Sequence, residues 1–285
     1  MLRRASSLGV ALIASATISV LAGQELTLPL TQGSVRMLVI GDSGTGDSAQ
    51  IDVARQMANF RAKFPYDFAI MLGDNMYGHE RPQDYARKFE APFKPLLDAK
   101  VEFHAALGNH DDPNQRFYKP FNLGGNRYRT FRKGNARFFV LDSNYMDPEQ
   151  LQWLEKELQA SGSDWKIPYF HHPIYTAATR GPNLELRSVL EPLFLKYGVN
   201  VVFTGHEHLY ERLKPQKGIR YFVAGGSAKL RRGDLQKSAQ TEVGYDNDRT
   251  FMLVEIAGDA FHFQTLTRAG TTIDKGVIQR QPKKQ

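Results

Sequence analysis

Polar side chains with metal-binding chemistry end five apolar segments of this 285-residue sequence. Each follows a run expected to be a buried strand, and the clusters are Asp42, Asp74, Asn109 with His110, His171 with His172, and His206 with His208. In open α/β sheets the carboxyl ends of the strands share one rim, where ligands bind. Buried there without a cation, the carboxylates would repel each other and the imidazoles would lack partners. The five clusters together therefore predict a metal site.

Each cluster taken alone has a structural alternative. An Asp after a Gly, such as Asp74 in GDNMYGH, is common in tight turns, but a turn does not need the Tyr77 that stands three residues later. His206 and His208 share one face of an extended segment, which makes a metal-binding role as plausible as a structural one. The carbonyl oxygen of Asn109 suits a divalent ion in a mixed site.

The first half of the chain alternates strands and helices, an order that predicts a parallel sheet. The expected elements are strands at 35–42, 67–74 and 101–110, a helix over 48–64, and a broken helix over 82–97. Ser48 is the expected N-cap of the first helix, while Pro92 and Pro95 interrupt the second.

The second half continues this alternation and then becomes rich in strands. We expect strands at 135–145, 165–173 and 200–208, helices at 147–160 and 186–199, and a β-meander built from 219–226, 250–266 and 271–278. Asp147 is the expected N-cap of its helix, with Gln150 completing a capping box. Residues 226–249 are polar and glycine-rich and are interpreted as a long loop, and such loops are often functional.

Composition narrows the class of protein. The chain has no Cys, which excludes a disulfide framework and any thiolate metal site. Its formal net charge is +7, but two Arg lie within residues 1–23 and three basic residues within 280–285, which leaves +2 on the rest. A nucleic-acid binder would cluster its charge on the body of the protein, so no nucleic-acid partner is expected.

The N-terminus has the layout of a secretory signal peptide. Arg3 and Arg4 precede an uncharged apolar stretch whose small residues suit cleavage after Ala22 or Gly23. The stretch is short and contains several Ser and Thr residues, so an uncleaved membrane anchor is the less favoured alternative. We expect an exported protein, periplasmic or secreted, with a signal peptide at 1–23, a lead-in segment at 24–33, one large domain at 34–279 and a basic tail at 280–285.

The order Asp42, GDNMY, GNHD, His171 and GHEH resembles that of the calcineurin-like metallophosphoesterases. The Tyr of GDNMY is similar to that of one branch, the purple acid phosphatases, and the size resembles the small, mammalian-type members. The resemblance runs from about Val35 to about Ile256. It implies an α/β fold, a four-layer α/β/β/α sandwich with a dinuclear metal site at the rim formed by the carboxyl ends of the strands, and hydrolysis of small-molecule phosphomonoesters.

The resemblance also assigns a role to each side chain. Asp74 would bridge two metal ions, the first held by Asp42, Tyr77 and His208, and the second by Asn109, His171 and His206. Two oxyanions besides the bridge suit Fe(III), whereas amide and imidazole ligands suit Fe(II), Zn(II) or Mn(II). The family pattern His-x-Pro selects His171 as the ligand, and His172 would point to the other face of the strand.

The implied chemistry is attack on phosphorus by a metal-bound hydroxide. His110 would assist the leaving group as general acid or electrostatic stabiliser, and Asp111 is either a partner that holds an imidazole or a turn residue. In small members another His is expected before GP, where this chain has Arg180, which can bind phosphate but cannot in practice donate a proton. Arg180 and His172 are therefore candidate substrate-binding residues; Arg231 and Arg232, in the polar loop, are further candidates, although solvated charges are the favoured interpretation.

Other functions are compatible with the same metal ligands. A phosphodiesterase, for instance one acting on cyclic nucleotides, would use the same metals. A redox-active or metal-storing di-iron protein would not hydrolyse esters, and the complete ligand set together with His110 argues against it. An inactive scaffold would be expected to lack a ligand, and none is missing from the pattern.

Overall fold

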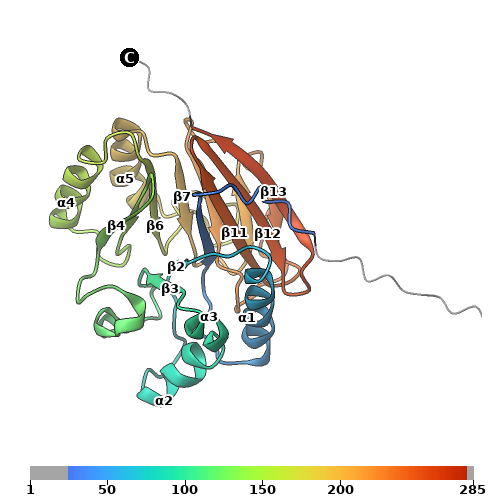
Figure 1. Cartoon of the computed structure of the whole chain (residues 1–285). Helices are drawn as coiled ribbons and strands as arrows, with labels where there is room; N and C mark the ends of the chain where they lie inside the picture. Colours follow the sequence, from blue (N-terminus) through green and yellow to red (C-terminus); the bar gives the residue numbers. More distant parts are fainter. Residues whose placement is uncertain (1–24, 281–285) are drawn as a thin grey trace, which may run out of the picture.

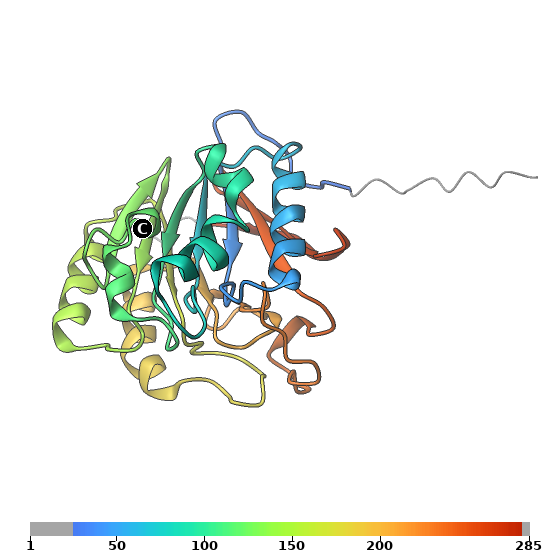
Figure 2. The ribbon, with the colours of Figure 1, turned by 90° about the horizontal axis from the view of Figure 1, so that it is seen from below.

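The computed structural model describes residues 25–280, so the expected signal peptide at 1–23 and all but the first residue of the expected basic tail lie outside the described residues. Two β-sheets pack face to face, and helices cover the outer face of each sheet (Figure 1). Seen from below, α4 (Pro148–Gln159) and α5 (Leu184–Tyr197) lie on one side of the strands and α1 (Ser48–Arg61) lies on the other (Figure 2). Among the described residues, no helix is long and apolar enough to cross a membrane.

The first sheet has six strands in the order β13-β12-β11-β1-β2-β3. Their bounds are β1 Val35–Ile40, β2 Phe68–Met71, β3 Glu102–Ala105, β11 Thr250–Ala257, β12 Ala260–Thr267 and β13 Thr272–Gln279. β1, β2 and β3 pair in parallel, as the alternation of strands and helices predicts, while β11, β12 and β13 form an antiparallel meander.

The second sheet has seven strands in the order β10-β8-β9-β7-β6-β5-β4. Their bounds are β4 Arg129–Lys133, β5 Ala136–Val140, β6 Trp165–Phe170, β7 Val201–Thr204, β8 Tyr210–Leu213, β9 Arg220–Ala224 and β10 Thr241–Tyr245. The expected place of β9 in the meander is wrong, because β9 pairs in parallel with β7 and antiparallel with β8. The expected loop 226–249 also contains β10, which pairs with β8.

The core consists of three apolar layers, because alternate residues of the inner strands face opposite sides. Between the sheets, Met37 and Val39 of β1 pack in one cluster with Phe138 of β5 and Phe203 of β7. The alternate residues of the first sheet pack against α1, and those of the second sheet pack against α4 and α5. The result is the four-layer α/β/β/α sandwich that the resemblance implies.

Two helix starts differ from expectation. The N-cap of α1 is Asp47 rather than Ser48, since the Asp47 carboxylate accepts a hydrogen bond from the Gln50 N–H at 2.9 Å. Asp147 does cap α4, but Gln150 forms no capping box. Its side-chain amide instead donates to the carbonyl oxygens of Asp142 and Tyr145, both at 3.0 Å, and so holds the preceding loop.

The segment 82–97 is an interrupted helix, as expected, but Pro95 does not cause an interruption. It consists of α2 (Pro82–Tyr85), a π-helical turn over Ala86–Glu90 and α3 (Lys94–Asp98). Pro95 lies in the first turn of α3, where a missing N–H costs no helical hydrogen bond. Two short 3₁₀ helices follow β3, at Pro113–Phe117 and Lys119–Phe121.

The lead-in segment packs on the first sheet. The N–H groups of Leu30 and Thr31 donate to the carboxylate of Glu255 in β11, at 2.8 and 2.5 Å. Thr27 N–H donates to the side-chain oxygen of Gln264 in β12 at 2.9 Å, and Leu28 is buried in the apolar layer beside α1. Residues near the start of the described chain are therefore held by strands near its end.

Candidate metal centre

The side chains singled out by the sequence meet at one rim of the molecule, to which both sheets contribute. Loops after β1, β2 and β3 of the first sheet and after β6 and β7 of the second carry them. The seven residues of the expected ligand set, all placed at this rim, are Asp42, Asp74, Tyr77, Asn109, His171, His206 and His208.

Three of these residues have a backbone conformation that L-residues rarely adopt. The φ angles of Asp42, Asp74 and His206 are 53°, 50° and 70°. The motif glycines allow this crowded backbone: a Cβ on Gly108 would lie 2.2 Å from the Asp74 carboxylate, and one on Gly205 would lie 2.6 Å from that of Asp42. Strained backbone of this kind clusters at functional sites.

The first group of donors surrounds Asp42. One ligand atom each from Asp42, Asp74 and His208 lies within 4.8 Å of the others. The hydroxyl of Tyr77 donates to Asp42 Oδ1 at 3.0 Å and lies 3.3 Å from His208 Nε2. Three oxygen donors and one nitrogen donor therefore face one small volume.

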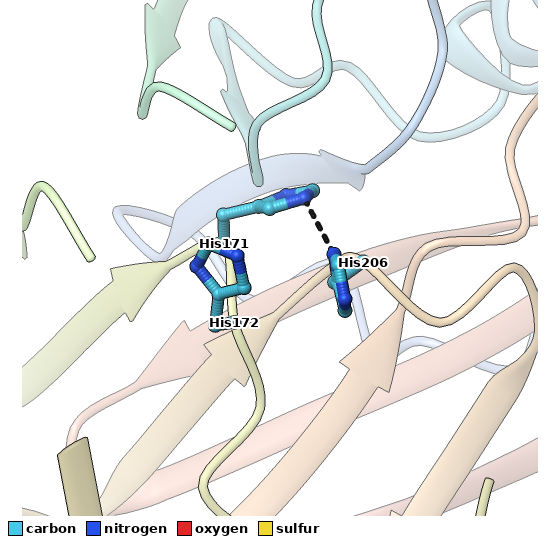
Figure 3. Close-up of side chains that lie close together, drawn as sticks. All are labelled: His171, His172 and His206. Carbon is cyan, nitrogen blue, oxygen red and sulfur yellow. Dashed lines mark hydrogen bonds between the residues drawn. The ribbon is translucent and has the colours of Figure 1, made fainter. Parts of the chain in front are cut away.

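The second group surrounds His171 Nε2. His171 Nδ1 lies 3.0 Å from the carbonyl oxygen of Leu72, to which it donates, and this leaves Nε2 as an acceptor. His171 Nε2 lies 3.0 Å from Asn109 Oδ1, 3.1 Å from His206 Nδ1 (Figure 3) and 3.3 Å from Asp74 Oδ1. Asp74 thus contacts both groups, as a bridging ligand must.

The donor set fits a cation better than it fits protons. His171 Nε2, Asn109 Oδ1 and Asp74 Oδ1 are all acceptors, and His206 Nδ1 can supply at most one proton to them. Burial lowers the pKa of His206 to about 2, so the protonated imidazolium is strongly disfavoured there. Metal ions at the two groups would satisfy these acceptors.

The first group has the same excess of acceptors. Burial raises the pKa of Asp42 well above its usual value, and the charge of Asp74 adds to the effect. Burial and the two carboxylates raise the pKa of Tyr77 as well, so a phenolate at Tyr77 requires a cation. Burial lowers the pKa of His208 to about 4.

His172 does not point to the other face, contrary to expectation. Its ring centroid lies 4.6 Å from that of His206 and 5.0 Å from that of His171, and the three rings form one cluster (Figure 3). β6 ends at Phe170, so strand alternation no longer applies at the two imidazoles. His172 Nδ1 is 2.9 Å from Ser143 Oγ, which also accepts the His172 N–H at 3.1 Å.

His110 is exposed at the edge of the centre. Its N–H donates to Asp74 Oδ1 at 3.0 Å, and its ring centroid lies 5.0 Å from that of Tyr77. Asp111 holds no imidazole. Its carboxylate accepts the N–H groups of Gly108 and Met76, at 2.7 and 2.9 Å, and therefore fixes the loop as a turn residue does.

The three Arg candidates lie in different places. Arg180 Nη1 contacts His206, 3.2 Å from Nε2 and 3.3 Å from the carbonyl oxygen, so the guanidinium borders the second group. Arg231 lies 3.8 Å from Asp234. Arg232 donates to the carbonyl oxygen of Asn247, and no contact of it with the centre occurs in the described chain.

Several residues at the centre were not found from the sequence. Lys229 Nζ lies 4.5 Å from the ring centroid of Tyr77, and Ser143 contacts His172. Glu207 is fully buried between two expected ligands, and neither carboxylate oxygen has a hydrogen-bond partner among the described residues. Burial raises the pKa of Glu207 to about 7. Only Glu207 had a local signal, namely its place within GHEH.

The chain is similar to known proteins over most of its length. Residues 35–210 match the sequence pattern of the calcineurin-like phosphoesterase family. The chain is 27% identical to human tartrate-resistant acid phosphatase type 5, over 90% of this chain and 96% of the relative. It is 26% identical to purple acid phosphatase 7 of Arabidopsis thaliana, over 88% of each chain.

Solved structures share the fold. GAP50, described as the anchor in the inner membrane complex of Plasmodium, has a TM-score of 0.76 at 19% identity, with 88% of this chain and 90% of that chain covered. Purple acid phosphatase PPD1 from yellow lupin has a TM-score of 0.70 at 19% identity, with 87% of this chain and 54% of that chain covered.

Proposed function

We propose that this chain, which belongs to the calcineurin-like phosphoesterase family, is an exported acid phosphatase that hydrolyses phosphomonoesters with two metal ions. The phosphoesterase class follows from the family and from the acid phosphatases to which the chain is similar over about nine-tenths of its length. The observation that carries the proposal is the contact of Asp74 with both donor groups.

The proposed ligands divide between the two ions. Asp74 would contact both, Asp42, Tyr77 and His208 would complete the first site, and Asn109, His171 and His206 would complete the second. The first site contains carboxylate and phenolate oxygens, which favour Fe(III), and the second contains neutral amide and imidazole donors, which favour Fe(II), Zn(II) or Mn(II). Relatives named purple acid phosphatases support two metals, but not these identities.

The chain's own residues have separate tasks in this proposal. When bound, the two ions supply phosphate binding and an acidified water. His110, exposed beside Tyr77, donates a proton to the leaving oxygen. Arg180 would turn from His206 toward a phosphate oxygen, because a His206 that held a metal through Nδ1 would carry its proton on Nε2 and could not accept from a guanidinium.

The test measures activity and metal content together. The chain from residue 24 onward is purified, its iron, zinc and manganese are quantified, and rates are compared on nitrophenyl phosphate and bis-nitrophenyl phosphate. Asp74→Ala should lose metal and activity together, while Asp52→Ala, which removes a carboxylate on α1 away from the centre, should change neither. Faster turnover of the diester would show that the protein is a phosphodiesterase instead. A metal-loaded protein that is inactive on both esters would refute the proposed hydrolysis.

Export is part of the proposal and rests on the sequence of residues 1–23. The full chain, expressed in a Gram-negative bacterium, should be recovered from the periplasm with a mass that corresponds to cleavage after Ala22 or Gly23. Recovery of the uncleaved chain from the membrane would instead favour the anchor.

A further inference from the structure

A cavity of about 440 Å³ opens beside the candidate metal centre. Asn109 and His172 form one part of its wall, and the loop that carries Asn109 also carries His110. In the proposed function, on which this inference rests, a phosphate at the metals therefore has its organic part next to this cavity. The shape and chemistry of the wall then select the alcohol part of the ester.

Tyr145 forms an aromatic platform at this cavity. Tyr145 lines the cavity and is 61% exposed, so the residue is accessible to a ligand. Its backbone is fixed, because the carbonyl oxygen accepts hydrogen bonds from Arg127 at 3.2 Å and from Gln150 at 3.0 Å. The Arg127 guanidinium lies 5.9 Å from the ring centroid. A ring held on a fixed backbone is ready to stack on a ligand without much ordering.

Asn183 adds a polar group to the same wall. Its Oδ1 accepts the N–H of Leu186 at the start of α5, which fixes the orientation of the amide. Its Nδ2 donates no hydrogen bond within residues 25–280, so it can donate to an acceptor in the cavity. An aromatic face and an amide donor together suit a flat ring that carries acceptor atoms.

We infer that the cavity binds an aromatic ring in the alcohol part of the ester, stacked on Tyr145, and that ring-bearing phosphomonoesters are the preferred substrate class. Nucleoside 5′-monophosphates and phosphotyrosine both offer this chemistry. The nucleobase also offers acceptors for Asn183, so nucleotides should benefit more.

The experiment compares kcat/KM for adenosine 5′-monophosphate, phosphotyrosine, ribose 5-phosphate and glycerol 2-phosphate in each variant. The ratio of wild type to variant on one ester cancels the intrinsic reactivity of that ester. Tyr145→Ala should lose about tenfold on the two ring-bearing esters, mainly through KM, and less than about twofold on the other two. Tyr145→Phe should retain wild-type values, since stacking needs only the ring.

Phe117→Ala is the matched control, because Phe117 is 64% exposed, lies under the Arg116 guanidinium, and does not line the cavity. It should leave all four rates unchanged. An equal loss on all four esters in Tyr145→Ala, or no loss on any, would overturn the inference.

Binding separates this inference from the proposed function. Saturation-transfer NMR with adenosine, on the metal-free protein, should show contact to the base in wild type and Tyr145→Phe but not in Tyr145→Ala. Contact without hydrolysis of any ester would refute the proposed function and support the cavity. If the esters were hydrolysed without ring selectivity and adenosine made no contact, the inferred ring binding would be refuted and the proposed function would stand.

Discussion

Asp74→Asn should make the metal-free protein more stable while it abolishes metal-dependent activity. Asp74 is 1% exposed, and its carboxylate belongs to a group in which ligand atoms of Asp42, Asp74 and His208 lie within 4.8 Å of one another. Without a cation, two buried carboxylates face each other at that range. The amide of Asn has the same size, tolerates the φ of 50° and can still accept the His110 N–H, so the substitution mainly removes the charge.

The magnitude follows from the separation of the carboxylates. Two unit charges no more than 4.8 Å apart repel by roughly 3.5 kcal/mol or more at an effective dielectric constant of about 20. Burial and the charge of Asp74 raise the pKa of Asp42. Partial protonation of Asp42 therefore reduces the repulsion in the metal-free protein. We therefore expect a gain of about 1 to 3 kcal/mol in the free energy of unfolding.

The assay is urea unfolding at pH 7 in excess chelator, with wild type and variant compared at equal m-values. Asp84→Asn is the matched control, since Asp84 lies 2.9 Å from Arg81, 3.7 Å from Arg87 and 3.8 Å from Lys88. The same chemical change should there lower stability. If Asp74→Asn were less stable than wild type in chelator, the idea that the empty centre is electrostatically strained would be wrong.

Three further outcomes are expected. His110→Ala should retain both metals and lose about a hundred- to ten-thousand-fold in rate on alkyl esters, with a smaller loss on nitrophenyl phosphate; equal losses on both would contradict a proton donor. Tyr77→Phe, loaded with iron and oxidised, should lose the visible absorption that a phenolate ligand gives, whereas a colourless wild type would exclude phenolate ligation. Burial and the charge of Arg129 lower the pKa of His104 to about 4, below its unfolded value of about 6.5, so the unfolded chain binds more protons as the pH falls through this window. Stability should therefore be complete above pH 6.5 and fall by about 2 kcal/mol at pH 5, and His104→Gln, compared by urea unfolding at pH 7.5 and 5, should lack this part of the loss.

The expected ligands could be found from the sequence because they lie in the loops that follow strands, several of which have clear apolar runs. β1, β2 and β7 are buried at nearly every residue, and this makes the run and its end visible. The motif glycines mark where ligand loops approach each other, as Gly108 and Gly205 show. The local sequence pattern was therefore enough to predict both the strand ends and the residues that follow them.

Features that depend on distant pairing were missed. β10 has the sequence TEVGY, polar and interrupted by Gly, and is a strand only because β8 pairs with it. β9 has the pattern of a meander strand, but its position beside β7 is decided by parallel pairing across a long connection. Lys229 reaches Tyr77 from a loop that no spacing rule connects to the centre. The turn from β6 to Pro173 likewise decided the direction of His172.

The docked lead-in segment determines the order in which the chain can finish folding. Its partners Glu255 and Gln264 lie more than 220 residues later in the sequence than Thr31 and Thr27. The first part of the described chain to be synthesised can therefore reach its final place only after β11 and β12 have been made. Contacts of such sequence separation form late and slowly. A chain that is exported as it is made would keep its front end accessible to a processing protease throughout that interval.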